Sequence, residues 1–111
     1  MKKLAVVAFG GNALLQAGQK GTIDEQEQNA YEASKNLLNL LRINYNVVIT
    51  HGNGPQVGNI LLSDQAGHQV HGLPHMPLDV CVAYSQGFIG YLIEQQLRNV
   101  LEANDMERDI I

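Results

Sequence analysis

Several residue types are scarce in this 111-residue sequence, and each scarcity excludes a class of protein. Cys81 is the one cysteine, so no internal disulfide can form, which is typical of a protein of the reducing cytoplasm. Lysine and arginine number 7 against 11 acidic residues, a formal net charge of −4, whereas nucleic-acid binding requires a positive field. The apolar runs are only as long as a β-strand, too short to span a bilayer. We therefore expect a cytoplasmic protein that binds neither nucleic acid nor membranes.

The order of apolar runs and polar breaks predicts an α/β fold with a parallel sheet. Residues 3–9 form an almost uninterrupted apolar run, typical of a parallel strand covered on both faces. Thr22 and Glu25 have the spacing of a helical capping box, and an apolar stripe at steps of three and four extends the predicted helix to about Arg42. The β-branched residues 47–50 predict a second strand. The result is a strand–helix–strand unit with a right-handed crossover.

A further helix is predicted directly after the second strand. Pro55 is placed where proline favours the first position of a helix, and the helical pattern continues to about Ala66. The side chains expected to face the core are Val57, Ile60 and Leu61. Residues 67–77 contain three histidines and two prolines, so we predict a surface loop there.

The last third of the chain predicts one long helix and the beginning of a third strand. The helix should span residues 78–103 and bury Cys81 as a small hydrophobe. Gly87 and Gly90 lie inside it, where each costs about 1 kcal/mol relative to alanine, so we expect another element to approach both closely. Residues 109–111 are typical of the start of a strand. Because two strands are too few for a stable sheet, we predict that residues 1–111 are a fragment of a longer protein.

Two glycine-rich segments are the strongest functional feature of the sequence. Gly10-Gly11-Asn12 follows the first predicted strand, and Gly52-Asn53-Gly54 follows the second. In a parallel sheet both segments lie at the carboxyl ends of the strands, the edge at which α/β proteins bind ligands. Glycine lets backbone N–H groups approach an anion closely, and the helix that begins near Pro55 directs its positive end to the same place. The pair predicts an anion-binding site rather than two ordinary turns.

Other chemistries find little support in the sequence. Neither glycine segment is followed by the Lys-Ser or Lys-Thr of a P-loop, and a dinucleotide fingerprint fails because Val57 stands at the position of the third glycine. All the serines lie within predicted helices, so no nucleophile elbow is predicted. We expect the ring of His51 to hydrogen-bond a neighbouring carbonyl rather than act as a base. The histidines of residues 67–77 have no accompanying cysteine, which favours a solvated loop over a zinc site.

Three blocks of the sequence resemble carbamate kinases, which are members of the amino acid kinase family. The blocks are residues 7–14 (VAFGGNAL), residues 50–58 (THGNGPQVG), and residues 76–83 (MPLDVCVA) with 85–91 (SQGFIGY). The resemblance covers essentially the whole chain, but only about the first third of a typical family member. It implies a three-layer α/β sandwich with a mainly parallel central sheet. It also implies reversible transfer of a phosphoryl group between ATP and carbamate, in which carbamoyl phosphate and ADP yield ATP.

Site residues and partners follow from the resemblance. Placed by motif position, Gly10, Gly11 and Asn12 would line the transferred phosphoryl group, and Gly52, Asn53 and Gly54 would hold the carbamoyl end and the same phosphate. No catalytic residue is identified within residues 1–111. ATP or ADP and Mg²⁺ would be bound mainly by the carboxyl-terminal half of such an enzyme. The resemblance further implies a cytoplasmic homodimer in arginine metabolism.

One position separates carbamate kinases from other members of the family. Many amino acid kinases have a lysine two residues before the glycine pair, where this sequence, like carbamate kinases, has Ala8. A lysine beyond Ile111 would then neutralise the phosphate, so residues 1–111 alone should be inactive. Two alternatives stay open. One is a non-catalytic anion-binding or oligomerisation module, and the other is an amino acid kinase that acts on a larger carboxylate.

Overall fold

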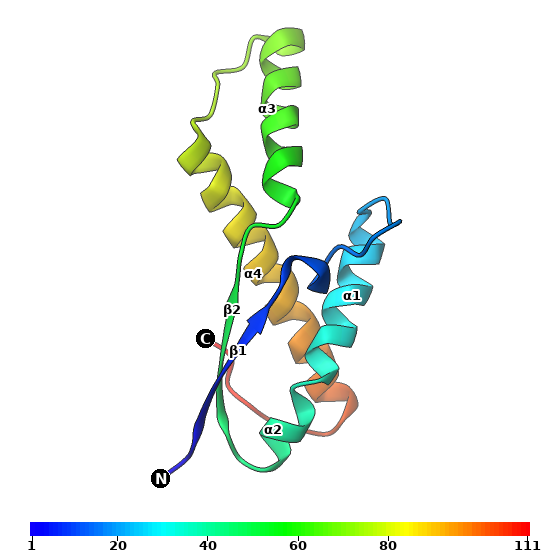
Figure 1. Cartoon of the computed structure of the whole chain (residues 1–111), viewed down its shortest axis with the longest axis vertical. Coiled ribbons are helices and arrows are strands. Elements are labelled where there is room, and N and C mark those ends of the chain that lie inside the picture. The colour runs from blue at the N-terminus through cyan, green and yellow to red at the C-terminus, as the bar shows by residue number, and fades with distance from the viewer.

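Two parallel strands and four α-helices build the chain shown in Figure 1, a computed structural model that describes residues 1–111 except the side chain of Asn12. In chain order the elements are β1 (Leu4–Phe9), the 3₁₀-helix η1 (Gly11–Ala13), α1 (Ile23–Lys35), α2 (Leu38–Arg42), β2 (Asn46–His51), α3 (Gln56–His71) and α4 (Leu78–Ala103). The α/β class and the parallel pairing of the two strands agree with the sequence analysis.

Helices cover one face of the sheet. A core cluster joins Phe9 of β1 to Ala30 of α1 and to Ile89 and Ile93 of α4, and Figure 1 shows α1 and α4 side by side behind the strands. The opposite face of the sheet carries three large apolar side chains that are exposed, Leu4, Val6 and Val48. The described residues thus supply one helical layer and the sheet.

The helix predicted over residues 22–42 is split in two. It begins with the predicted capping box, in which the Glu25 N–H donates to Thr22 Oγ1 at 3.2 Å and the Thr22 N–H donates to Glu25 Oε1 at 3.5 Å. After α1 the next two N–H groups donate to carbonyls three residues earlier, as in a tighter 3₁₀ turn. This turn offsets α2 from α1, so that the adjacent side chains of Leu37 and Leu38 are both buried.

The third helix is longer and less covered than predicted. It extends through residues 67–71, which the sequence analysis placed in a loop, because the stop comes at Gly72 with φ +65°. Val57 and Ile60 are half-buried, whereas Leu61 is exposed, contrary to prediction. The reason is visible in Figure 1, where α3 stands away from the sheet with α4 beside it.

The long helix α4 has the predicted bounds and contributes many of the buried side chains of the core. Cys81 is fully buried, as expected of a small hydrophobe. A β-carbon on Gly90 would meet the His51 ring at 3.9 Å, an ordinary contact with β2. At Gly87 the expected close approach is wrong for the described residues, since no atom of another element lies within 4 Å of the β-carbon position.

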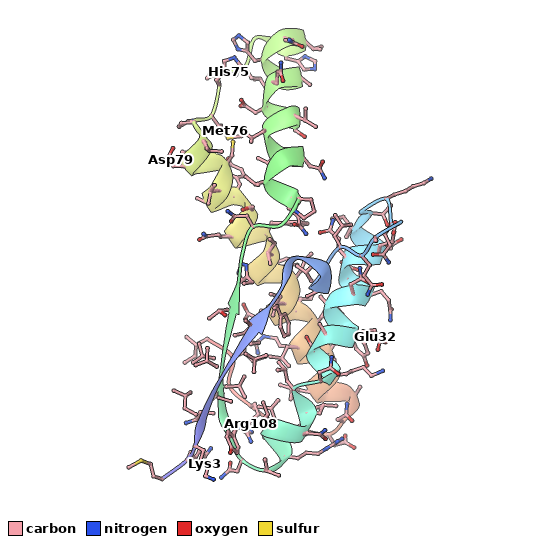
Figure 2. All side chains as sticks on the ribbon, viewed as in Figure 1. Lys3, Glu32, His75, Met76, Asp79 and Arg108 are labelled. Atoms are coloured by element: carbon pink, nitrogen blue, oxygen red, sulfur yellow. The ribbon has the colours of Figure 1, made fainter. Side chains whose placement is uncertain are left out.

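The carboxyl-terminal segment does not form the predicted third strand within the described residues. Its backbone is held by a side chain instead, because Arg98 Nη2 donates to the carbonyl of Ile110 at 3.1 Å. Arg108 donates to the carbonyls of Leu41 and Tyr45, which ties the segment to the turn between α2 and β2. Figure 2 places Arg108 at the end of the molecule opposite to His75.

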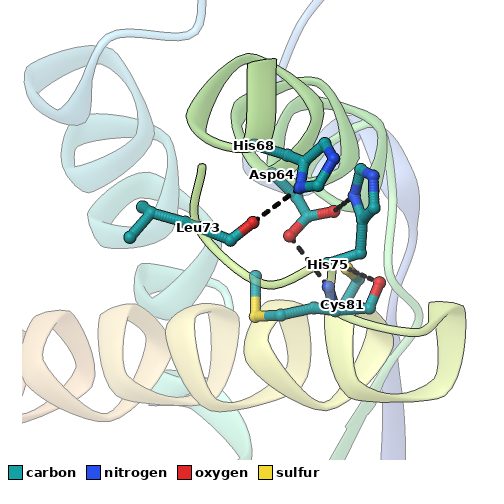
Figure 3. Close-up of polar contacts among 6 residues, drawn as sticks. Asp64, His68, Leu73, His75 and Cys81 are labelled. Carbon is teal, nitrogen blue, oxygen red and sulfur yellow. Dashed lines mark hydrogen bonds and ion pairs between the residues drawn. The ribbon is translucent and has the colours of Figure 1, made fainter. Parts of the chain in front are cut away.

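A hydrogen-bonded clasp closes the loop between α3 and α4 (Figure 3). The carboxylate of Asp64 accepts from the His75 ring at 3.1 Å and from the Met76 N–H at 2.9 Å. The His68 ring stacks on His75 with centroids 3.7 Å apart, and His68 Nδ1 bonds the Leu73 carbonyl at 2.7 Å. The hydrogen bond from His75, followed by that from Met76, lowers the pKa of Asp64.

The clasp predicts a pH-dependent contribution to stability. Because the folded-state pKa of Asp64 lies below its ordinary value of 3.8, the unfolded chain binds the proton more tightly. The contribution is therefore complete above about pH 4 and is lost as the pH falls through the folded-state pKa. We expect Asp64→Asn to lower the melting temperature at about pH 6, with a difference from the unsubstituted protein that shrinks below about pH 4. Thermal unfolding followed by circular dichroism measures this difference.

The matched control is Glu107→Gln, which removes an exposed carboxylate from the other end of the molecule. Its melting temperature should follow that of the unsubstituted protein across the same pH range. An Asp64→Asn difference that is constant with pH would contradict the role given to the carboxylate.

Candidate functional site

The parallel register brings the two glycine segments together. Phe9 lies opposite His51 at the carboxyl ends of β1 and β2, so both segments leave the sheet at the same edge. A small cavity of about 50 Å³ lies between them. Four of the predicted site residues line it, Gly10, Gly11, Gly52 and Gly54. His51 and Gln56, which were not predicted as site residues, line it as well. The side chain of Asn12, predicted to contact a phosphoryl group, lies outside the described residues.

The helix that follows the second segment points its amino-terminal end at this edge. α3 begins at Gln56, directly after Pro55, and runs for 16 residues. The first N–H groups of any α-helix have no acceptor within the helix, and they carry the positive end of its dipole. These donors and the glycine backbone suit an anion at the cavity.

Asn53 does not line the cavity, and its side chain is held by the long helix. The hydroxyl of Ser85, which is fully buried, lies 3.0 Å from Asn53 Oδ1 and 2.6 Å from the Val82 carbonyl, and its single proton can be donated to only one of them at a time. This contact holds the side-chain amide of Asn53 against α4. Nothing in the sequence indicated this contact, because Ser85 and Asn53 are 32 positions apart.

His51 has the structural role that the sequence analysis expected. Its Nδ1 lies 2.9 Å from the Gly52 carbonyl, and a carbonyl only accepts, so Nδ1 carries the proton. The ring is thereby fixed against Gly90 of α4.

A pair of buried glutamines beneath the glycine segments was missed by sequence reasoning. Gln26 of α1 donates from Nε2 to the Gly21 carbonyl at 2.8 Å, and Gln56 donates from Nε2 to Gln26 Oε1 at 3.1 Å. Gln56 Oε1 is buried and has no hydrogen-bond partner among the described residues. Gly54 has φ +57°, and a β-carbon there would lie 2.5 Å from this oxygen. Gly54 is thus required by both its backbone conformation and its neighbour.

Metal centres and membrane-spanning helices are both absent from the described part of the chain. No group of three or more His, Cys, Asp or Glu side chains in that part could hold a metal ion. None of the described helices combines the length and the apolar character needed to cross a membrane. Two of the three histidines of the predicted surface loop, His68 and His75, hydrogen-bond within the clasp.

The fold and the site define an α/β unit with two glycine segments gathered at one end of a parallel sheet. No protein-family model matches the chain. It is 50% identical over 111 residues to the carbamate kinase of Pyrococcus horikoshii and 47% identical to that of Pyrococcus furiosus, covering 100% of this chain and 35% of each relative. The solved structure of carbamate kinase from Giardia lamblia bound to AMP-PNP matches with a TM-score of 0.89 and 47% identity, over 97% of this chain and 37% of that one.

The chain is thus a homologue of carbamate kinases over its whole length. It spans about a third of the length of the curated relatives that it matches.

The glycine segments predict two distinct effects of adding a side chain. Nothing described lies within 4 Å of a β-carbon at Gly52, so Gly52→Val should keep the fold and obstruct only a bound anion. We expect its affinity for inorganic phosphate to fall at least about tenfold, with the melting temperature nearly unchanged. Gly54→Ala should instead lower the free energy of unfolding by about 1–2 kcal/mol, because of its positive φ and the clash with Gln56.

Calorimetric titration with phosphate and thermal unfolding of both variants separate these effects. Unchanged phosphate affinity in a folded Gly52→Val protein would remove this segment from the anion site.

Proposed function

We propose that the protein is a carbamate kinase, which transfers a phosphoryl group reversibly between ATP and carbamate. In this proposal residues 1–111 supply the part of the enzyme that holds carbamate or carbamoyl phosphate. The observation that carries it is the meeting of the two glycine segments at one sheet edge, in a chain about half identical to carbamate kinases. The remaining substrate-binding and catalytic groups would belong to the counterpart of the other two thirds of those relatives.

Backbone groups carry most of the proposed binding. Gly10 and Gly11 would direct N–H groups toward the transferred phosphoryl group, together with Asn12. Gly52 and Gly54 would face the same phosphate from the second segment. Asn53, whose side chain is held by Ser85, would hold the carbamoyl end. The start of α3 adds its positive dipole end.

The proposed chemistry explains why no general base is needed. Carbamate is already an anionic oxygen nucleophile, so no proton has to be removed before it attacks the phosphorus. Phosphoryl transfer through a loose transition state depends on in-line positioning and on neutralising the phosphate charge. The residues that line the cavity supply positioning but no lysine or arginine. We therefore propose that the neutralising cations lie outside residues 1–111.

Nucleotide and metal binding are assigned to the same part of the enzyme, which lies outside residues 1–111. The Giardia relative was solved with AMP-PNP, an ATP analogue, and it is about three times as long as this chain, which covers 37% of it. The described residues contain no cluster that fits a metal ion. We propose that ATP or ADP and Mg²⁺ bind mainly to the part of the enzyme beyond these residues.

We also propose a cellular location, an oligomeric state and a metabolic role for the enzyme. The single cysteine supports a cytoplasmic location, where thiols stay reduced. Tyr84 and Tyr91 are exposed on α4, on either side of the open position at Gly87, which supports a homodimer that covers this helix. Synthesis of ATP from carbamoyl phosphate would place the enzyme in the degradation of arginine.

Substrate specificity provides one test of the proposal. The cavity between the glycine segments is small, so we expect full-length protein to phosphorylate carbamate and to leave glutamate and acetylglutamate unreacted. A coupled assay of ADP formation from ATP with each acceptor measures this. Turnover of either amino acid at a rate near that of carbamate would favour a kinase for larger carboxylates.

The division of labour provides a second test. Residues 1–111 expressed alone should form no ATP from carbamoyl phosphate and ADP, because nucleotide and metal are assigned elsewhere. The exposed apolar side chains of the open sheet face should also make this polypeptide self-associate. A luciferase assay of ATP and the mass in solution by light scattering check both expectations. Robust ATP synthesis by a monomer would overturn the division.

A further inference from the structure

We propose that Gln56 Oε1 accepts a hydrogen bond from the amide nitrogen of the carbamoyl group, and that this contact selects carbamate over carboxylates of the same shape. The inference rests on the proposed function and deepens it by assigning a specificity residue. Gln56 lies outside the six residues placed at the site by motif position, and its role follows from the contacts of its side chain.

The orientation of the Gln56 amide is determined by a backbone carbonyl. The Gly21 carbonyl can only accept, so the group of Gln26 that faces it must be Nε2. Gln26 Oε1 then faces Gln56, and the group of Gln56 that faces Gln26 must be Nε2. Gln56 Oε1 is consequently the atom directed to Gly54. The common exchange of oxygen and nitrogen in amide side chains is thereby excluded.

Gln56 Oε1 is a buried hydrogen-bond acceptor without a donor among the described residues. Gln56 is only 5% exposed, and its Oε1 has no partner among the described residues. A buried polar atom without a partner is uncommon in native proteins, because it has lost its hydrogen bonds to water without replacement. Gln56 belongs to the lining of the cavity between the glycine segments, so a ligand bound there can supply the donor.

The substrate offers such a donor at one place. Carbamoyl phosphate has oxygen acceptors on its carbonyl and phosphate groups, and its N–H donors are confined to the amide nitrogen. Acetate and acetyl phosphate have a methyl group at that position, which would leave Oε1 unpartnered. A larger acid has a CH₂ group at that position, which likewise donates no hydrogen bond. A site built to hydrogen-bond a substrate N–H rejects analogues that lack this group.

Contact requires a small movement of the glycine segment. The oxygen is closed off from solvent and lies beneath Gly54, which has no side chain and a left-handed φ of +57°. In this proposal the segment of residues 52–55 opens by the amount needed for the amide nitrogen to reach Oε1. The contact then forms away from competing water.

The test compares two phosphonates that differ at the proposed contact. Phosphonoacetamide has the amide of carbamoyl phosphate, and 2-oxopropylphosphonate has a methyl group in its place. We expect full-length protein to bind the amide more tightly and Gln56→Met to lose about tenfold of this preference. Calorimetric titration gives the ratio of the two dissociation constants. Because both ligands share the phosphonate, general damage to the site would weaken both and leave the ratio unchanged.

Gln96→Met is the matched control, since Gln96 is a buried glutamine on α4 that does not line the cavity. Its ratio should equal that of the unsubstituted protein. A second measurement needs no variant: magnetisation transfer in NMR from the ligand amide protons to the Gln56 side chain should be observed. The proposal is overturned if the unsubstituted protein does not distinguish the phosphonates, if the Gln56→Met ratio is unchanged, or if the transfer is absent. Failure of the unsubstituted protein to turn over carbamoyl phosphate would refute the kinase assignment separately.

Discussion

The parallel pairing of β1 with β2 is the constraint on which the rest of the site depends. The register sets Phe9 beside His51, and each strand ends one residue before a glycine segment. A shift of one residue would turn the inward side chains of one strand to the exposed face and separate the segments. The helices preserve this register, since Phe9 packs into the core formed with α1 and α4. The site is therefore a product of core packing, although most of its proposed contacts are made by backbone groups.

Side chains support the glycine segments from below. Ser85 of α4 holds the amide of Asn53, and the His51 ring bonds the Gly52 carbonyl while it lies against α4. Gln26 connects the loop before α1 to the start of α3. Each support comes from an element that also belongs to the core or packs on it. Glycine provides room for a ligand but little rigidity, and these contacts restore the rigidity that a binding site requires.

Much of the fold was predictable from local patterns, and the exceptions have physical causes. The capping box at Thr22 and the bounds of α4 were predicted because they depend on neighbouring residues. The break between α1 and α2 was missed because burying adjacent leucines is a tertiary requirement that helical periodicity does not show. The third strand was overpredicted, since a strand needs a ladder partner and residues 109–111 have none among the described residues. The glycine segments were visible in the sequence, whereas Ser85 and the Gln26–Gln56 pair depend on contacts between residues far apart in the chain.

The contact between Gly54 and Gln56 has a consequence for how the sequence can change over evolutionary time. A β-carbon at position 54 would stand 2.5 Å from the glutamine oxygen, so the two positions cannot vary independently. A lineage that acquires alanine at position 54 must also shorten or turn away the side chain at position 56. A shorter residue at position 56 releases the steric demand at position 54, where the left-handed backbone still favours glycine or asparagine. Substitutions at these two sites should therefore appear together in divergent descendants, with the change at position 56 preceding the change at position 54.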